Sequence, residues 1–251
     1  MRTTWLTALA AAITLPPMLA VVAEVSPAYA ACTGAGNYFV GGSTPYRDDT
    51  RGVLAHIDVP DVVPAVGCGN GFTDVWDMVT PVAGNGHDYY AQIGFGVDYI
   101  TTDGSVPATV TPRMISFAQY TDFNGVVHTS VYPAPALGSE HTYTELYTGG
   151  HLQMKDNGVV KSQTPFDPTL YWPSGWQGQF YNEAAYTRTS AWGSVPNNKV
   201  RFHSIQKWVN GAWTDFGGWM PGSPMTQSTN WNVETYAPTD STLGLRTWDN
   251  R

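Results

Sequence analysis

The stretch Tyr89-Tyr90-Ala91-Gln92-Ile93-Gly94-Phe95-Gly96-Val97 alternates regularly between two kinds of side chain. Successive side chains of a β-strand point to opposite faces of its sheet. One face would carry Ala91, Ile93, Phe95 and Val97, and the other Tyr90, Gln92, Gly94 and Gly96. The first set is apolar, so the pattern predicts a strand that covers a core with one face only.

The same alternation, with Thr, Val and Tyr enrichment and Gly/Pro punctuation, recurs along the chain, and no long segment has helical spacing. This pattern is typical of a β-sandwich or a barrel. Neither a linker nor an internal repeat divides the chain, so we expect one domain over residues 31–251.

Tight hairpins are expected at three Asn-Gly pairs, because type I′ turns need positive φ at both central residues. The pairs are Asn124-Gly125, Asn157-Gly158 and Asn210-Gly211. In the last hairpin, Trp208 would stack on Trp213 across the strands. The C-terminal 35 residues predict a strand or two near Trp231–Tyr236 and loop elsewhere.

The first thirty residues have the pattern of an export signal. Arg2 precedes an apolar stretch, and Ala28-Tyr29-Ala30 gives the small-x-small motif that signal peptidase cleaves. A membrane anchor is disfavoured, because Pro16-Pro17 interrupts the stretch and Glu24 ends it before it reaches spanning length. We therefore expect a secreted, extracellular protein that begins at Ala31 and does not sit in a membrane.

The chain is acidic but poor in charge. Its formal net charge is -8, and only 13% of its residues are charged, beside 10 tryptophans and 14 tyrosines. Such a balance excludes a typical nucleic-acid-binding protein. It suits recognition by aromatic surfaces, and a protein with few salt bridges tolerates low pH.

The chain has two cysteines, Cys32 and Cys68. Both would enter an oxidising compartment after export, so a disulfide between them is expected. Such a bond contributes about 3 to 4 kcal/mol by restricting the unfolded chain. A lipid anchor at Cys32 is disfavoured, because Tyr29 stands where an aliphatic residue is needed.

Motifs of the common hydrolases are absent from the sequence. It contains no G-x-S-x-G, no H-E-x-x-H and no Gly-rich phosphate loop. The six histidines lack metal-ligand spacing, so we expect no metal and no cofactor. A Ser-His-Asp triad assembled from distant segments stays open.

A second alternating stretch, Trp176 to Tyr186, places Gln179, Tyr181, Glu183 and Ala185 on one face. A carboxylate among aromatic and small residues is partly desolvated and suited to proton transfer. An ordinary exposed strand glutamate would give the same pattern. The amide of Gln92, flanked by glycines, similarly fits either a plain solvent face or a place where another molecule's backbone approaches closely.

Taken in order, several segments are similar to those of the glutamic peptidases, or eqolisins. The segments are His56-Ile57-Asp58-Val59-Pro60, Val75-Trp76, Gln92-Ile93-Gly94-Phe95, Gly178-Gln179-Phe180-Tyr181-Asn182-Glu183, Gly193-Ser194-Val195-Pro196 and Lys199-Val200-Arg201-Phe202. The resemblance implies a two-sheet antiparallel β-sandwich of the concanavalin-like jelly-roll type. It implies that Gln92 and Glu183 are the catalytic pair of an acid endopeptidase, a monomer that acts on extracellular polypeptides. It also implies a substrate-binding surface that includes Trp76, Tyr90, Gly94, Gln179 and Tyr181.

The chain departs from the eqolisin pattern at three places. Thr80 stands where the family has an aspartate four residues after its tryptophan, with Asp77 the nearest acid. The family's Tyr-Glu-Trp-Tyr-Pro strand is replaced by residues 117–121, and the first glutamate of its last motif by Gln179. Two other functions therefore stay open. One is a carbohydrate-binding or carbohydrate-active sandwich, in which Glu183 would need a second carboxylate from Glu140, Glu145, Asp98 or Asp122. The other is an inactive sandwich of the same fold.

Overall fold

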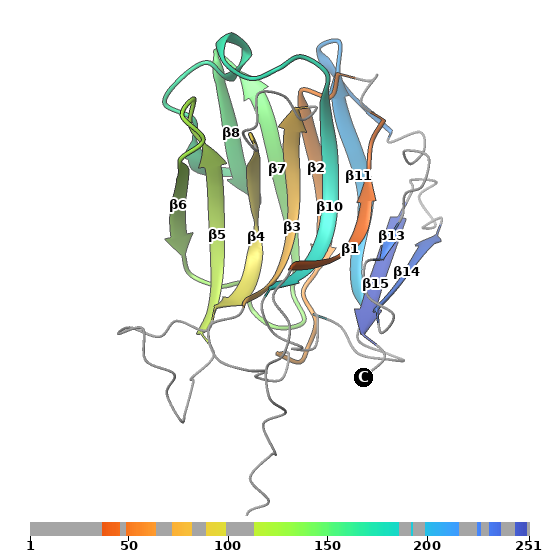
Figure 1. Ribbon diagram of the computed structural model, residues 1–251. Coiled ribbons are helices and arrows are strands. Elements are labelled where there is room, and N and C mark those ends of the chain that lie inside the picture. Colours follow the sequence, from red (N-terminus) through yellow and green to blue (C-terminus); the bar gives the residue numbers. More distant parts are fainter. Residues whose placement is uncertain are drawn as a thin grey trace, which may run out of the picture.

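The computed structural model describes residues 37–45, 49–63, 72–81, 89–98, 113–185, 192, 199–215, 225–226, 231–236 and 244–249. Within them, two antiparallel sheets lie face to face (Figure 1). The seven-stranded sheet has the order β13 (Met225–Thr226), β1 (Asn37–Ser43), β10 (Trp176–Ala185), β3 (Phe72–Pro81), β4 (Ala91–Asp98), β5 (Arg113–Thr121) and β6 (Val127–Tyr132). The eight-stranded sheet has the order β14 (Trp231–Tyr236), β15 (Gly244–Asp249), β11 (Val200–Val209), β2 (Gly52–Asp58), β7 (Glu140–Thr148), β8 (His151–Asp156) and β9 (Val159–Gln163), and β12 (Ala212–Asp215) pairs with β11.

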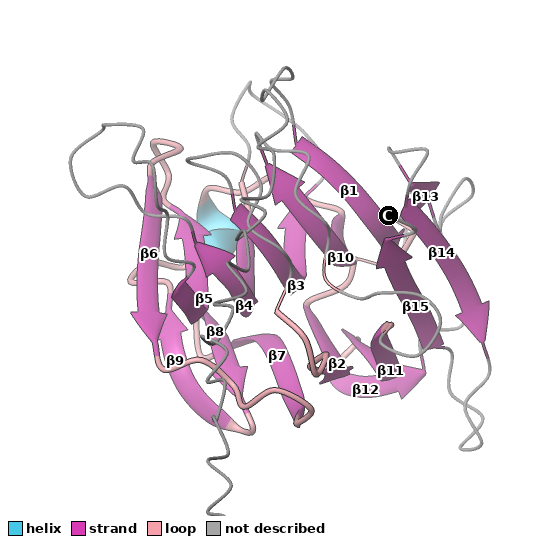
Figure 2. Ribbon diagram, turned by 90° about the horizontal axis from the view of Figure 1, so that it is seen from below, coloured by secondary structure: helices cyan, strands magenta, loops and turns pink. Residues whose placement is uncertain are grey.

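The view from below in Figure 2 shows the two layers of the sandwich. One short 3-10 helix, η2 (Pro168–Leu170), precedes β10. The expected all-β, two-sheet antiparallel sandwich is therefore confirmed. Among the described residues, no helix has the length and apolarity to span a bilayer.

The core lies between the sheets and follows the alternation of the strands. Ala91, Ile93, Phe95 and Val97 of β4 are fully buried, as their pattern predicts. They pack with side chains of the facing sheet, such as Ile57 and Leu152, in one hydrophobic cluster. Burial of each large apolar side chain contributes about 1.5 to 3 kcal/mol, so this cluster is the main source of stability.

Two of the three Asn-Gly pairs form the expected two-residue turns. Asn157 and Asn210 have φ of 50° and 53°, and the glycine after each also has positive φ, which makes two-residue loops. Trp208 pairs with Trp213 as expected, but their rings meet edge to face at 72° and do not stack.

A hairpin also forms around Asn124-Gly125, since β5 pairs antiparallel with β6, but the expected two-residue turn is wrong, because residues 122–126 make a longer loop. The reason is Asp122, whose Oδ1 accepts hydrogen bonds from the amides of Asn124 and Val126, at 2.8 and 3.0 Å. This side-chain turn satisfies the backbone and widens the loop.

The expected C-terminal strand at Trp231–Tyr236 is present as β14. A strand that we did not expect, β15, lies between β14 and β11. The export signal, the two cysteines and the loop at 193–196 lie outside the described residues, so the expectations about them stay predictions.

Two carboxyl groups lie in the core, Asp77 on β3 and Glu145 on β7, and both are completely buried. Burial raises the pKa of each well above its usual value. Neither carboxyl has a hydrogen-bond partner among the described residues. Both pKa shifts favour protonated carboxyls inside the sandwich.

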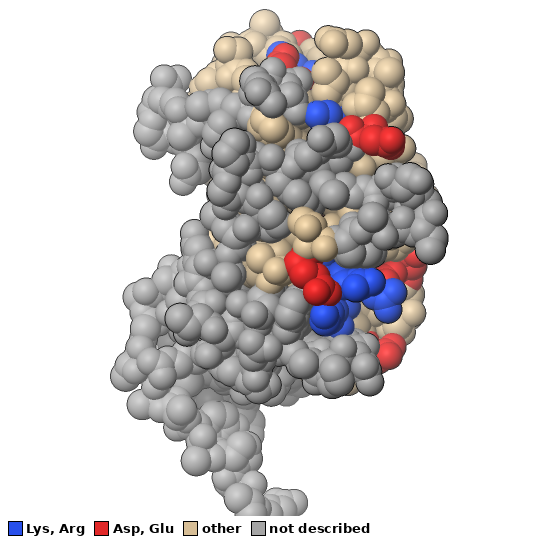
Figure 3. All heavy atoms as spheres, turned by 90° about the vertical axis from the view of Figure 1, so that its right-hand side faces the viewer, with Lys and Arg blue, Asp and Glu red and all other residues tan. Residues whose placement is uncertain are grey.

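Charged side chains are few in this chain, at 13% of the residues. On the described part of the face drawn in Figure 3, acidic and basic side chains gather in small mixed groups. Such a group is formed by Glu234, whose carboxylate lies 2.8 Å from Lys199 and 3.4 Å from Arg246.

Candidate active site

The candidate site lies on the outer face of the seven-stranded sheet, which points away from the core. Trp76, Phe117 and Tyr181 form a hydrophobic cluster of their own on this face, with Phe39 and Met78 packed against it. Their strand neighbours, such as Val75 and Phe180, point into the core instead. The alternation of β3, β4 and β10 therefore decides which side chains are available to a ligand.

The strand register arranges the expected site residues in successive rows across β4, β3 and β10. The first row holds Gln92, Met78 and Gln179, the second Gly94, Trp76 and Tyr181, and the third Gly96, Asp74 and Glu183. Tyr90 lies just before β4, where its backbone is hydrogen-bonded to Thr121 of β5. The six other expected catalytic and substrate-binding residues belong to one face of the sheet.

Trp76 holds Glu183 in place at the centre of this face. Its indole Nε1 donates a hydrogen bond to Oε2 of Glu183 at 2.8 Å. Glu183 is only 7% exposed and Trp76 2%. A buried carboxylate with a fixed donor has a fixed orientation, which is what a proton-transferring group needs.

Gln92 is held by a residue that the sequence did not single out, Gln119 of β5. The Nε2 of Gln92 donates to the Oε1 of Gln119 at 2.6 Å, and Gln119 donates in turn to Thr129 at 3.1 Å. An amide nitrogen has two N–H donors. Its second donor has no partner among the described residues and can bind an oxygen of a ligand.

Gln92 and Glu183 are offset along a diagonal of the sheet, on strands separated by β3. In a flat sheet their Cα atoms would lie about 13 Å apart along the strands and about 10 Å apart across them. Gln92 is the second residue of β4 and Glu183 is the third from the end of β10, and Figure 1 shows β3 between these two strands.

Neighbouring strands of a sheet rotate by roughly -20 to -25° relative to one another, so the separation of the two side chains differs from that in a flat sheet. Trp76 of β3 lies between the two positions, in the row that follows Gln92 and precedes Glu183. That Gln92 and Glu183 share one water molecule stays a prediction.

Glycines make room for the bulky groups of the face. An added Cβ at Gly94 would overlap the carbonyl oxygen of Val75 and lie 2.8 Å from the Cα of Trp76. At Gly96 it would overlap the carboxylate of Asp74. The space beside both glycines is thus occupied from within the chain, which explains the glycines without a ligand.

Asp74 is a further candidate that sequence reasoning missed. It lies directly opposite Glu183 on the neighbouring strand, where side chains are about 4.5 to 5.5 Å apart at Cβ. The sequence could have revealed it, because Asp74 lies two residues before Trp76 and alternation places both on one face of the strand.

The four carboxylates considered earlier as mates of Glu183 are less well placed. Glu145 lies in the core and Glu140 belongs to the other sheet. Asp122 lies in the turn after β5, and Asp98 ends β4 opposite Phe72.

The residue that replaces the family's supporting aspartate has a structural role. The hydroxyl of Thr80 donates to the carbonyl of Tyr89 at 2.8 Å, which ties the end of β3 to the start of β4. Asp77 cannot substitute for that aspartate, because its side chain points into the core. Among the described residues, none of this face belongs to a group with metal-ligand geometry.

No family model matches the sequence, and no curated protein matches it. Among solved structures, SCP-B, a member of the eqolisin family of peptidases in complex with the tripeptide Ala-Ile-His, superposes with a TM-score of 0.51 at 12% identity, over 86% of this chain and 100% of its own. The chain has an eqolisin-like fold.

Scytalido-glutamic peptidase with a transition state analog inhibitor gives a TM-score of 0.51 at 12% identity, over 84% of this chain and 98% of its own. An alginate lyase from Alteromonas sp.272 reaches 0.36 at 12% identity, over 59% of each chain, which is too low to support an argument. The resemblance expected from the sequence is confirmed for the fold, over most of the chain.

Proposed function

We propose that this protein is a secreted, acid-active endopeptidase of the glutamic type, with Gln92 and Glu183 as its catalytic pair. The observation that carries the proposal is the shared outer face of these two residues, on either side of Trp76, which donates to Glu183. The eqolisin-like fold supports it, because that fold hosts peptidases in SCP-B and in scytalido-glutamic peptidase. The N-terminal signal pattern supports secretion.

In the proposed mechanism, Glu183 takes a proton from water as the water attacks the scissile carbonyl carbon. The same carboxyl then returns the proton to the leaving amine. The second N–H of Gln92 donates to the developing oxyanion, and one such donor typically lowers the barrier by about 3 kcal/mol. Trp76 and Gln119 act as positioning residues, because each holds a member of the pair by a hydrogen bond.

The core favours operation in acid. Asp77 and Glu145 have raised pKa values because burial disfavours their charged forms. The contribution of these two groups to stability is fully present when both are protonated, which means at low pH. This agrees with an acid-active enzyme.

The test is digestion of a denatured protein by the purified wild type and its variants at acidic and neutral pH. We expect acid-dependent cleavage that falls about 100- to 1,000-fold with Gln92→Ala and at least about 100-fold with Glu183→Gln. Matched controls are Gln163→Ala, at an exposed strand position, and Glu234→Gln, in a surface ion pair. Cleavage retained in both site variants, or lost equally in the controls, would refute the assignment.

A second function is favoured by one observation, the position of Asp74 opposite Glu183. Retaining glycosidases hold two carboxyl groups about 5 to 5.5 Å apart, and side chains that lie directly opposite each other on neighbouring strands are close enough to reach such a separation. Release of reducing sugar from soluble polysaccharides, abolished by Asp74→Asn, would support this function. The peptidase proposal predicts no such release.

A further inference from the structure

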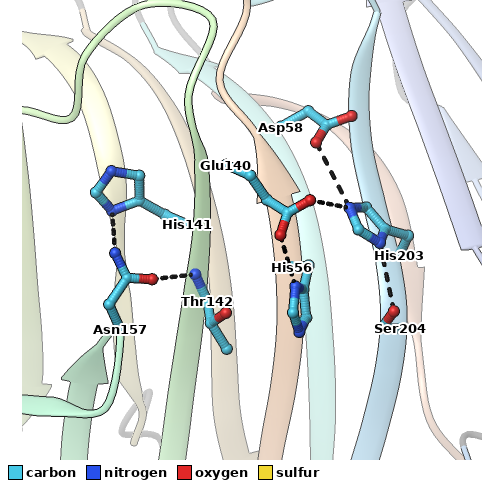
Figure 4. A network of polar contacts seen from close by, with 8 residues as sticks. All are labelled: His56, Asp58, Glu140, His141, Thr142, Asn157, His203 and Ser204. Atoms are coloured by element: carbon cyan, nitrogen blue, oxygen red, sulfur yellow. Dashed lines mark hydrogen bonds and ion pairs between the residues drawn. The ribbon is translucent and has the colours of Figure 1, made fainter.

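A second group of reactive side chains lies on the outer face of the other sheet, remote from the candidate active site. It comprises His56 of β2, Glu140 of β7 and His203 of β11, and Figure 4 shows the carboxylate of Glu140 between the two imidazole rings. Oε1 of Glu140 lies 2.9 Å from Nδ1 of His56, and Oε2 lies 3.1 Å from Nε2 of His203. Asp58 borders the group, with Oδ1 3.5 Å from the same Nε2.

The strand register explains why these residues meet. The order β11-β2-β7 places His203 directly opposite His56, and Asp58 directly opposite Glu140. Asp58 follows His56 by two residues, so both lie on one face of β2. Four side chains thus form two adjacent cross-strand pairs on three hydrogen-bonded strands.

An irregularity of β11 fixes the second imidazole. The pairing with β2 shifts its register immediately after His203, and Ser204 has a left-handed φ of 49°. Bulges of this kind re-aim side chains and are frequent next to functional sites. Oγ of Ser204 lies 3.4 Å from Nδ1 of His203. Nε2 is then the nitrogen that faces the carboxylates.

The donor set fits a borderline transition metal. One ligand atom from each of His56, Glu140 and His203 lies within 4.8 Å of the others. Tetrahedral Zn²⁺ with bonds of about 2.0 to 2.2 Å needs its ligand atoms about 3.3 Å apart. The three side chains are 33%, 51% and 21% exposed, so they can rotate by the small amount required.

Charge also favours a cation here. Glu140 and Asp58 carry two negative charges, and the nearby Arg201, with Nε 3.3 Å from Asp58, carries one positive charge. With both imidazoles unprotonated, as metal ligation requires, the remaining charge is negative. Two imidazoles with a carboxylate suit Zn²⁺ better than Ca²⁺ or Mg²⁺, which prefer oxygen ligands alone.

We propose that His56, Glu140 and His203 bind one divalent transition-metal ion such as Zn²⁺, with Asp58 as a fourth ligand. The ion would join β2, β7 and β11, and so stabilise the eight-stranded sheet. This replaces the expectation of no metal site, which rested on spacing along the chain. Strands far apart in sequence supply the ligands, so no linear motif could reveal them.

Calorimetric titration of the untagged, chelator-stripped protein with ZnCl2 near neutral pH tests the proposal. We expect one ion per chain, and an affinity at least about tenfold weaker in His56→Gln and in His203→Gln. The control is His128→Gln, since His128 is also exposed and paired with one carboxylate, at 3.1 Å from Asp122. It should leave the affinity within about twofold.

A second readout separates loss of ligands from loss of folding. Zn²⁺ should raise the unfolding temperature of the wild type and of His128→Gln, because an ion that binds only the folded state stabilises it. The rise should be absent in His56→Gln and in His203→Gln. Absence of saturable binding to the wild type, or binding that both substitutions leave intact, would overturn the proposal and leave an ion-pair network only.

Discussion

Replacing both buried carboxyl groups, by Asp77→Asn together with Glu145→Gln, should flatten the dependence of stability on pH. Both groups are completely buried, and burial raises the pKa of each. The substitutions keep shape and polarity but remove ionisation. The variant therefore isolates the contribution of the two protons.

The sign follows from proton linkage. In the unfolded chain both carboxyls ionise near pH 4, whereas the folded chain keeps them protonated to higher pH because their pKa values are raised. The contribution of the two carboxyls to the free energy of unfolding is then fully present below about pH 4. It is lost as the pH rises toward their pKa values in the folded protein. Each retained proton lowers the free energy of unfolding by about 1.4 kcal/mol per pH unit. A slope of about 1.4 indicates one retained proton, and a slope of about 2.7 indicates two.

Urea denaturation followed by tryptophan fluorescence, at steps of pH from about 4 to 6, measures this slope. The window lies below the usual pKa of histidine. This choice matters because Asp58 raises the pKa of His203, so the titration of His203 would also lower the free energy of unfolding as pH rises, but at higher pH. Glu234→Gln is the control: hydrogen bonding to Lys199 lowers the pKa of Glu234, so its loss should leave the fall intact. A wild type whose stability is constant or rises over this range, or a double variant with the wild-type slope, would refute the reasoning.

Three further changes test other parts of the structure. Trp76→Phe should lower kcat for peptide cleavage about tenfold, because it removes the N–H that orients Glu183; an unchanged pH profile and kcat would argue against that role. Gly94→Ala should lower the free energy of unfolding by about 1 to 3 kcal/mol in urea denaturation, because a Cβ there would overlap the neighbouring strand. Asn210→Ala should cost about 1 kcal/mol in the same assay, since residue 210 has a φ of 53°, and restoration by Asn210→Gly would identify the backbone as the cause.

The faces of the strands were predictable from sequence, because alternation alone decides them. The core position of Phe95 and the outer position of Gln92 both followed from the period of two. The same rule, applied to residues 75–79, would have placed Asp77 in the core beside Val75 and Val79. That carboxyl was overlooked because an acidic residue in a core is rare.

The partners across strands were not predictable, because register depends on the whole fold. Nothing in the sequence places Gln119 beside Gln92, or Asp74 opposite Glu183. The cluster around His56 depends in addition on the bulge of β11. The Asn-Gly rule predicted the two-residue turns at residues 157–158 and 210–211 correctly. It was wrong at residues 124–125, because the side chain of Asp122 accepts hydrogen bonds from the amides of that loop.

The strand β3 lies between the two strands that carry the proposed catalytic pair, and it acts as their spacer. The distance between Gln92 and Glu183 therefore depends on how strongly β3 coils. Residues on its hidden side can change that coiling without touching any ligand. Substitutions at Val75 or Val79, both fully buried, would alter turnover at a distance while the reacting groups themselves stay the same.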